Sequence, residues 1–318
     1  MSRTRLTFLG SGTSLGVPIV GCTCPKCTSP DPRDKRLRAS AYVEYEGLRI
    51  LVDVGPDYRS QMLSHGLCGM DAILLTHDHK DHTGGFDDLR AMNYVGRQVA
   101  EIYCEPYVLE SLKKAFSYAF MDEKYPGVPE VSVHLVGNEP FVVYPIDRDK
   151  VLDWVRNEGY RYRLPSGELL PVGNPLERAE TVSDPSFSGK SRGVRGNGAE
   201  IIPIRGLHDR LPVLGFRFGK IAYLTDMSSI PESEFEKLRG LEHVTLNTVS
   251  YTPHHSHFSL NEALDVAGRI GARHTWLTHL SHSFPRHEEF CEELRRLCIS
   301  RGLSTDVQPA CDGLTIEA

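Results

Sequence analysis

One stretch joins an apolar run to a cluster of ionisable side chains: Leu74-Leu75-Thr76-His77-Asp78-His79-Lys80-Asp81-His82. The apolar residues predict a strand that ends at Thr76 and is followed by a tight turn. In such a turn the ionisable side chains can converge on one point, namely His77, His79, Asp81 and His82. Imidazoles with a carboxylate suit zinc, manganese or iron, so the stretch predicts a site for a pair of such ions. The alternative is a solvated histidine-rich loop, but no hydrophobic pattern requires three histidines there.

The composition limits the classes of partner. The 318 residues include 36 basic and 42 acidic side chains, a net charge of -6, so no overall field attracts nucleic acid. A small anionic substrate is compatible because bound metal ions would add local positive charge. We expect no membrane association and a cytoplasmic location, since there is no apolar run of about 18 residues and Met1 to Leu9 lacks the apolar segment of a signal peptide. A homodimer is compatible with the sequence.

A second cluster consists of three cysteines, in Gly21-Cys22-Thr23-Cys24-Pro25-Lys26-Cys27. A disulfide framework is not expected in a large chain of cytosolic character. Three closely spaced thiolates instead indicate a structural zinc that lacks its fourth ligand. A surface loop with spare thiols is the alternative.

The first half of the chain is typical of paired strands. Thr4 to Leu9 predicts a strand that breaks into a glycine turn, and Ala41 to Tyr45 with Leu48 to Asp53 predicts a hairpin. Asp53, at a strand end, is expected to support the His77 turn, and Asp57 to cap a helix over residues 58–64. Further strands are expected near residues 72–75, 101–104, 131–136 and 141–144, and a helix over 107–119.

Residues 145–198 lose this periodicity and predict an insertion, partly flexible, within one domain spanning 1–318. Beyond it, strands alternate with helices. Strands are expected over 200–204, 213–218, 220–224, 244–249 and 274–277, and helices over 232–238, 260–270 and 285–301. Ser259 and Glu262 match a capping box at the start of the second of these helices. Two sheets with helices packed outside is therefore the expected architecture.

Metal-binding residue types recur at strand ends, at His208, Asp226 and His279. Each alone is a weak signal, because a lone histidine is more often hydrogen-bonded than a ligand. Together with the stretch around His77 they complete a coordination set. A loop holding His254, His255 and His257 adds three more imidazoles, and the sequence does not decide which of them assists catalysis.

This set, His77-x-His79-x-Asp81-His82 with His208, Asp226 and His279, resembles the metallo-β-lactamase superfamily, which implies an α/β fold, a four-layer αββα sandwich. More narrowly, the chain resembles the phosphoribosyl 1,2-cyclic phosphate phosphodiesterases of the PhnP type. That resemblance covers nearly the whole chain and is carried by Gly10-Ser11-Gly12-Thr13, the cysteine loop, Leu224-Thr225-Asp226, His257, Leu277-Thr278-His279-Leu280-Ser281-His282 and Cys311-Asp312-Gly313-Leu314.

The resemblance implies roles for individual residues. His77, His79 and His208 would hold one ion; Asp81, His82 and His279 would hold the other, with Asp226 bridging. His282 would be the fourth ligand of the structural zinc bound by Cys22, Cys24 and Cys27. His257 would act beside the bridging solvent as an acid or a phosphate clamp, and Asp81 is also assigned to catalysis.

The implied activity is hydrolysis of a small, cyclic phosphodiester by metal-bound hydroxide, with two divalent ions, manganese or zinc with iron as an alternative, plus one structural zinc. An RNase Z-like tRNA-processing nuclease would use nearly the same ligands but should carry a basic exosite. A lactonase or thioesterase on the same fold would use the ions to polarise a carbonyl. A binding module stabilised by metal would have no activity. The sequence determines neither the native metal nor the physiological substrate.

Overall fold

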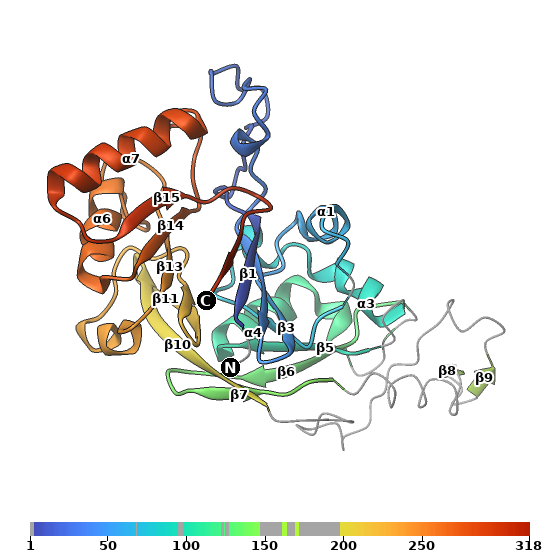
Figure 1. Cartoon of the computed structure of the whole chain (residues 1–318). Coiled ribbons are helices and arrows are strands. Elements are labelled where there is room, and N and C mark those ends of the chain that lie inside the picture. Colours follow the sequence, from blue (N-terminus) through green and yellow to red (C-terminus); the bar gives the residue numbers. More distant parts are fainter. Residues whose placement is uncertain are drawn as a thin grey trace.

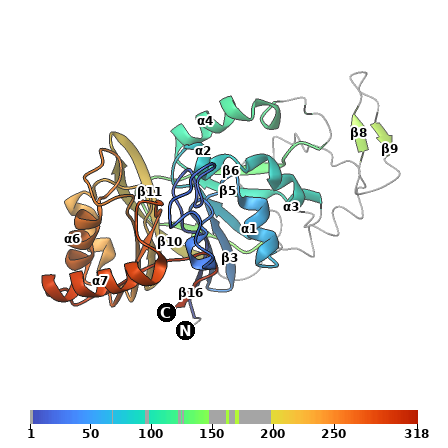
Figure 2. The ribbon, with the colours of Figure 1, turned by 90° about the horizontal axis from the view of Figure 1, so that it is seen from above.

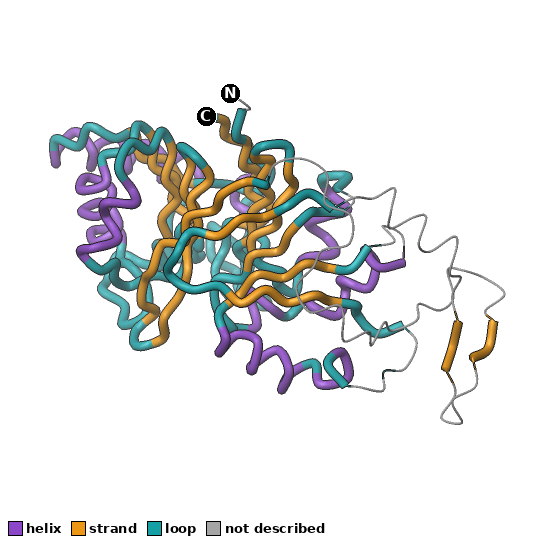
Figure 3. Tube along the Cα trace, turned by 90° about the horizontal axis from the view of Figure 1, so that it is seen from below, coloured by secondary structure: helices purple, strands orange, loops and turns teal. Residues whose placement is uncertain are grey.

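The computed structural model describes residues 3–67, 69–94, 98–121, 124, 127–146, 161–163, 169–171 and 198–318. Two seven-stranded mixed sheets pack face to face, and helices cover both outer surfaces (Figure 1). Viewed from above, α6 and α7 flank one sheet, and α1, α3 and α4 flank the other (Figure 2). The strands thus form the two inner layers between helical outer layers (Figure 3).

The first sheet has the order β16 (Thr315–Glu317), β1 (Arg5–Gly10), β2 (Ser40–Tyr45), β3 (Leu48–Val52), β4 (Ala72–Leu74), β5 (Ala100–Cys104), β6 (Val131–Leu135). The second has the order β15 (Asp306–Pro309), β14 (His274–Thr278), β13 (His243–Asn247), β12 (Ile221–Tyr223), β11 (Leu211–Phe218), β10 (Ala199–His208), β7 (Phe141–Val143). A separate two-stranded ladder joins β8 (Arg161–Arg163) to β9 (Leu169–Pro171). The helices are α1 (Tyr58–Ser64), α2 (Lys80–Thr83), α3 (Arg90–Tyr94), α4 (Pro106–Ala115), α6 (Leu260–Ile270) and α7 (His287–Arg301).

Three apolar clusters account for the layering. The central cluster contains residues of both sheets, such as Phe8, Ile50 and Phe216, and holds the sheets together. One outer cluster packs α6 and α7 on the second sheet, and the other packs α1 and α4 on the first. Because a strand buried on both faces needs apolar residues at successive positions, β4 reads Ala-Ile-Leu without alternation.

The chain ends meet in the first sheet. The Thr4 backbone N–H donates to the Ala318 carbonyl and the Ala318 N–H to the Thr4 carbonyl, each at 2.9 Å. Strand β16 runs antiparallel to β1, so both ends lie at the start of β1. The opposite end of β1 leads into the Ser11 turn, whose carbonyl accepts from the Leu280 backbone N–H.

Several predicted elements are confirmed. The hairpin of β2 and β3, helix α1 and helix α6 occur where the sequence placed them, and the capping box of α6 is complete. The predicted helix over 107–119 instead ends at Ala115 and is followed by a short 3-10 turn, and the helix over 232–238 is a 3-10 helix. Strands β15 and β16 and helices α2 and α3 were not predicted.

Two expectations are wrong. The first half does not pair only as hairpins, because β3, β4, β5 and β6 run parallel with helical connections, so each sheet is antiparallel on one side and parallel on the other. Asp57 stands at the N-cap of α1, but its carboxylate does not cap the helix. It accepts hydrogen bonds from the Arg38 guanidinium and backbone N–H instead, which joins α1 to the segment before β2.

The insertion predicted at 145–198 lies outside the described residues, apart from 145–146, 161–163, 169–171 and 198. Among the helices that are described, none combines the length and apolar character needed to cross a membrane.

The capping box gives a direct test of local stability. Ser259→Ala removes the side chain that accepts from the Glu262 backbone N–H, and we expect about 1 kcal/mol of lost unfolding free energy. Urea denaturation measures it. Ser300→Ala, on the exposed last turn of α7, is the control and should change stability by less than about 0.5 kcal/mol. Equal losses of unfolding free energy in the two variants would contradict the role of Ser259 as a helix cap.

Candidate metal centres

The predicted ligands meet at one edge of the sandwich. His208 ends β10, His279 directly follows β14, and Asp226 and His77 come three residues after β12 and β4. A backbone hydrogen bond of 3.0 Å from Leu214 to the Thr76 carbonyl links the two sheets at this edge. The topology therefore brings together residues up to 202 positions apart, from His77 to His279.

The backbone at this edge is unusual. Asp53, Asp226 and His279 have φ values of 63°, 58° and 57°, in the left-handed region that favours glycine. Each such residue costs on the order of 1–3 kcal/mol and persists where surrounding structure enforces it. The left-handed turn at each strand end redirects the chain, and all three side chains take part in the contacts of the site.

One group of donor atoms consists of Asp81, His82, Asp226 and His279, all within 4.8 Å of one another. His82 Nε2 lies 3.2 Å from one Asp226 oxygen, and His279 Nε2 lies 3.1 Å from the other. Asp81 Oδ2 lies 3.4 Å from His82 Nε2 and 3.7 Å from His279 Nε2. Such a set of imidazoles and carboxylates can hold a divalent ion.

A second group shares Asp226 and adds His208 and His257, again within 4.8 Å. The rings of His77 and His79 extend this side: His77 lies 4.6 Å from His79 and 5.5 Å from His208, and His79 lies 4.9 Å from His208, centroid to centroid. The structure therefore gathers all seven predicted metal-binding residues. Asp226 is common to the two groups, because its Oδ1 lies near both His279 of the first group and His257 of the second.

The buried carboxylate of Asp53 orients the neighbouring histidines, as predicted. It accepts from His82 Nδ1 at 2.6 Å and from the backbone N–H and hydroxyl of Thr76. Since the Thr76 hydroxyl donates to Asp53, its oxygen accepts from His77 Nδ1 at 2.9 Å. One carboxylate thus fixes the ring orientation of two histidines.

These contacts leave the other ring nitrogens free for a cation. With Nδ1 donating, the Nε2 atoms of His77 and His82 carry lone pairs, and both are buried without a hydrogen-bond partner among the described residues. His208 follows the same pattern, because its Nδ1 donates to the Asp226 carbonyl at 3.0 Å. A buried lone pair that lies against a carboxylate, as at His82 and Asp226, fits a bound divalent ion, so the residues present are suited to hold such ions.

The pKa shifts of the buried groups agree with a site for divalent ions. Burial lowers the pKa of His77 well below its ordinary value and also lowers the pKa of His208, so both rings are neutral, as a metal ligand requires. Burial alone would raise the pKa of Asp226, but His279 and His82 hold it well below the usual range. Burial opposes a charge on His82, but Asp226 and Asp53 together raise its pKa well above the ordinary value, so the site combines an ionised carboxylate with neutral rings at His77 and His208.

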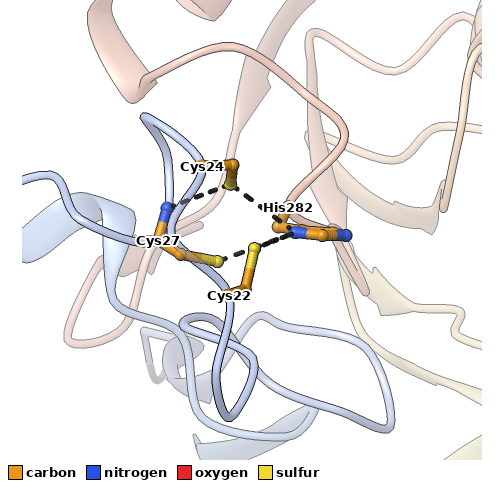
Figure 4. A group of neighbouring side chains, drawn as sticks. All are labelled: Cys22, Cys24, Cys27 and His282. Carbon is orange, nitrogen blue, oxygen red and sulfur yellow. Dashed lines mark hydrogen bonds between the residues drawn. The ribbon is translucent and has the colours of Figure 1, made fainter.

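The cysteine cluster forms a separate group, with Cys22, Cys24, Cys27 and His282 converging from two segments (Figure 4). His282 Nδ1 lies 3.3, 3.6 and 3.7 Å from the sulfurs of Cys22, Cys24 and Cys27. Tetrahedral zinc with Zn–S of about 2.3 Å and Zn–N of about 2.0 Å places nitrogen and sulfur about 3.6 Å apart. The geometry therefore fits the zinc site predicted from the sequence.

Buried charges hold this loop against the body of the protein. Lys26 donates to Asp34 at 2.9 Å and to the Pro285 carbonyl at 2.6 Å, and both charged side chains are at most 3% exposed. Asp34 also accepts from the His287 backbone N–H, the first residue of α7. The sequence did not reveal this contact, because its partners lie more than 250 residues apart.

The structure distinguishes the three clustered histidines. His257 contacts the site, with its ring 4.5 Å from His208 and 4.8 Å from His279, and Nδ1 3.6 Å from Asp226. His254 and His255 are exposed. Burial, reinforced by His279, lowers the pKa of His257 to about 3, so its ring is neutral near pH 7.

Comparison with known proteins agrees with this geometry. Residues 48–151 and 148–280 match the model of the beta-lactamase superfamily domain, and the chain belongs to this family. The crystal structure of a diphosphatase from the PhnP family is 33% identical, with a TM-score of 0.72, covering 100% of this chain and 98% of that one. The fold and the resemblance to PhnP-type proteins are thereby confirmed.

Two further relatives extend the comparison. The zinc-bound PqqB of Methylobacterium extorquens is 17% identical with a TM-score of 0.61, over 99% of this chain and 100% of that one, and shares the fold. A Porphyromonas gingivalis protein named octanoyltransferase is 36% identical over 292 residues. Those residues are 91% of this chain and 48% of the relative, so the chain spans about half the length of that protein.

We predict that Asp53→Asn weakens active-site metal binding by about 10–100-fold, because the amide cannot hold both the His82 and the Thr76 donors. Titration of the metal-free protein with manganese or zinc measures the affinity. Asp57→Asn, which alters a carboxylate bonded to Arg38 and to none of these histidines, is the control. Unchanged affinity in folded Asp53→Asn protein would refute the role of Asp53.

Cys22→Ser should release one equivalent of tightly bound zinc and lower the melting temperature, since a structural zinc contributes to folding free energy. Elemental analysis and calorimetry provide the readouts. Cys298→Ser, on α7 and away from the cluster, should leave the metal content unchanged. Full zinc retention by Cys22→Ser would exclude Cys22 as a ligand.

Proposed function

We propose that the protein hydrolyses a small phosphodiester, with a cyclic phosphodiester as the preferred class, using two divalent ions at the active site and a separate structural zinc. Manganese or zinc suits the active-site ligands, with iron as the alternative. The observation that carries the proposal is the position of Asp226, which belongs to both donor groups: Oδ2 lies 3.2 Å from His82, and Oδ1 lies 3.1 Å from His279 and 3.6 Å from His257.

The assignment of ligands follows the two groups. His77, His79 and His208 would hold one ion, Asp81, His82 and His279 the other, and Asp226 would bridge them. Bound as a pair, such ions activate a water molecule near neutral pH and neutralise the charge of a phosphodiester. The left-handed backbone at Asp226 and His279 keeps both side chains directed into this space before substrate arrives.

The protein's own groups would orient the reaction. His257, neutral and largely buried beside His208 and His279, would donate a hydrogen bond to a phosphoryl oxygen or to the leaving oxygen. Asp81, whose Oδ2 lies 3.4 Å from His82 Nε2, would orient the attacking water in addition to its role as a ligand. Hydrogen-bond donors held in place by the protein, in place of mobile water, would thus stabilise the negative charge of the substrate.

Partners and location follow the same proposal. A small anionic phosphodiester is the expected ligand, and a net charge of -6 favours neither nucleic acid nor a tRNA-processing activity of the RNase Z kind. The diphosphatase activity named for the PhnP-family relative supports phosphoryl chemistry. We further propose that the protein is cytoplasmic and that it can form a homodimer.

A second candidate function is hydrolysis of an acyl ester or thioester, because the same ions polarise a carbonyl. The 36% identity with the protein named octanoyltransferase favours it. The aligned residues make up 48% of the protein that carries that name. A phosphodiester is therefore the preferred substrate class.

The test compares substrates in one assay. Manganese-loaded protein should hydrolyse bis(4-nitrophenyl) phosphate or a 1,2- or 2′,3′-cyclic phosphate faster than 4-nitrophenyl octanoate. Asp226→Ala should lower kcat by at least about 100-fold, because both ion groups lose a shared ligand. Asp209→Ala, at the exposed β10–β11 turn, is the control. Turnover of the octanoate alone would select the second candidate, and full activity in Asp226→Ala would exclude the two-ion site.

A further inference from the structure

The hairpin of β10 and β11 carries His208 from the second sheet to the first. His208 is the last residue of β10 and pairs with Leu211 at the start of β11. Its ring lies 5.5 Å from that of His77 and 4.9 Å from that of His79, both of which follow β4 of the first sheet. The position of the hairpin relative to the first sheet therefore decides whether these three rings can share one ion.

A largely buried ion pair fixes β10 to the first sheet, three residues before His208. Arg205 on β10 donates from Nη1 and Nη2 to the two carboxylate oxygens of Glu105, each at 2.6 Å. The side chains of Arg205 and Glu105 are 16% and 10% exposed. Glu105 directly follows β5, which pairs with β4, the strand that leads to His77. Two parallel hydrogen bonds between planar charged groups set the orientation of the strands as well as their distance.

A second side chain of the same segment holds β11. Tyr107, in the first turn of α4, donates its hydroxyl to the Pro212 carbonyl at 2.6 Å. Pro212 pairs with Leu207, the residue directly before His208. Residues 105–107 thus contact both strands of the hairpin, β10 through an arginine side chain and β11 through a backbone carbonyl.

The donor group around His279 draws on other elements. Asp81 and His82 lie on α2, which follows β4 in the first sheet, and His279 follows β14, which β13 and β12 separate from β11. A shift of the hairpin relative to the first sheet would therefore move His208 more than any of these three residues. The two donor groups thus differ in their dependence on the contacts of residues 105–107.

We propose that Glu105 and Tyr107 are positioning residues that set His208 against the first sheet. They control the affinity for the ion assigned to His77, His79 and His208, and they leave the affinity for the other ion unchanged. This inference rests on the two-ion assignment of the proposed function. Neither side chain belongs to the donor groups, so both act through the hairpin, and a ligand displaced by a fraction of an ångström weakens a metal site.

The test is a calorimetric titration of protein that retains its structural zinc but lacks the active-site ions. Glu105→Gln keeps the shape of the side chain and removes its charge, so one of the two manganese ions should bind about tenfold more weakly, and the other should change by no more than about twofold. Tyr107→Phe, which loses only the hydroxyl, should weaken the same ion by about threefold. Glu101→Gln is the matched control, because that carboxylate pairs with His134 within the first sheet, and it should leave both affinities unchanged.

Double variants identify the ion that is weakened. Added to His279→Ala, Glu105→Gln should still weaken the remaining ion by about tenfold, whereas added to His208→Ala it should change the remaining affinity by no more than about twofold. Equal weakening of both ions, a tenfold loss in the His208→Ala background, or unchanged affinities in folded Glu105→Gln protein would overturn the proposal. Binding of fewer than two manganese ions by the wild type would contradict both this proposal and the two-ion site. Absence of phosphodiester turnover alone would refute the proposed function, while the titrations would still test Glu105.

Discussion

The carboxylate of Asp53 is the contact on which the geometry of the site depends. Buried and bonded to His82 and Thr76, it aligns one histidine directly and His77 through the threonine hydroxyl. A buried carboxylate carries a desolvation penalty, which here is offset by three donors. The hydrogen-bonded Nδ1 atoms then leave the buried Nε2 atoms of His77 and His82 without a partner among the described residues, and that of His82 lies 3.2 Å from Asp226, so contacts within the first sheet orient part of the candidate metal centre.

The strand β14 connects the two candidate metal centres. His279 follows it directly and joins the donor group around Asp226, and His282 joins the cysteine loop three residues later. Between them, Ser281 holds the loop that leads to His257. The segment from His279 to His282 thus contributes to both candidate metal centres. A displacement of the cysteine loop would be transmitted along it to the groups around Asp226.

Much of this could be predicted from residue types and periodicity. The candidate metal ligands around His77 are recognisable because they are adjacent in sequence, and helix α6 because its capping box is local. The role of Asp57 could not be predicted, because tertiary packing decides that its carboxylate accepts hydrogen bonds from Arg38 and does not cap the helix. Strand β16 was missed for a similar reason: three residues carry little pattern, and their pairing with β1 comes from the opposite end of the chain. The choice of His257 among three histidines likewise required the fold.

The pairing of Thr4 with Ala318 has an architectural consequence. The two chain ends leave the sandwich at one point, at the start of β1, whereas the opposite end of that strand leads toward Leu280 and the metal centres. Strand β1 therefore bears the pairing of the chain ends at its start and the contact with the segment of His279 at its far end, so its length separates the two.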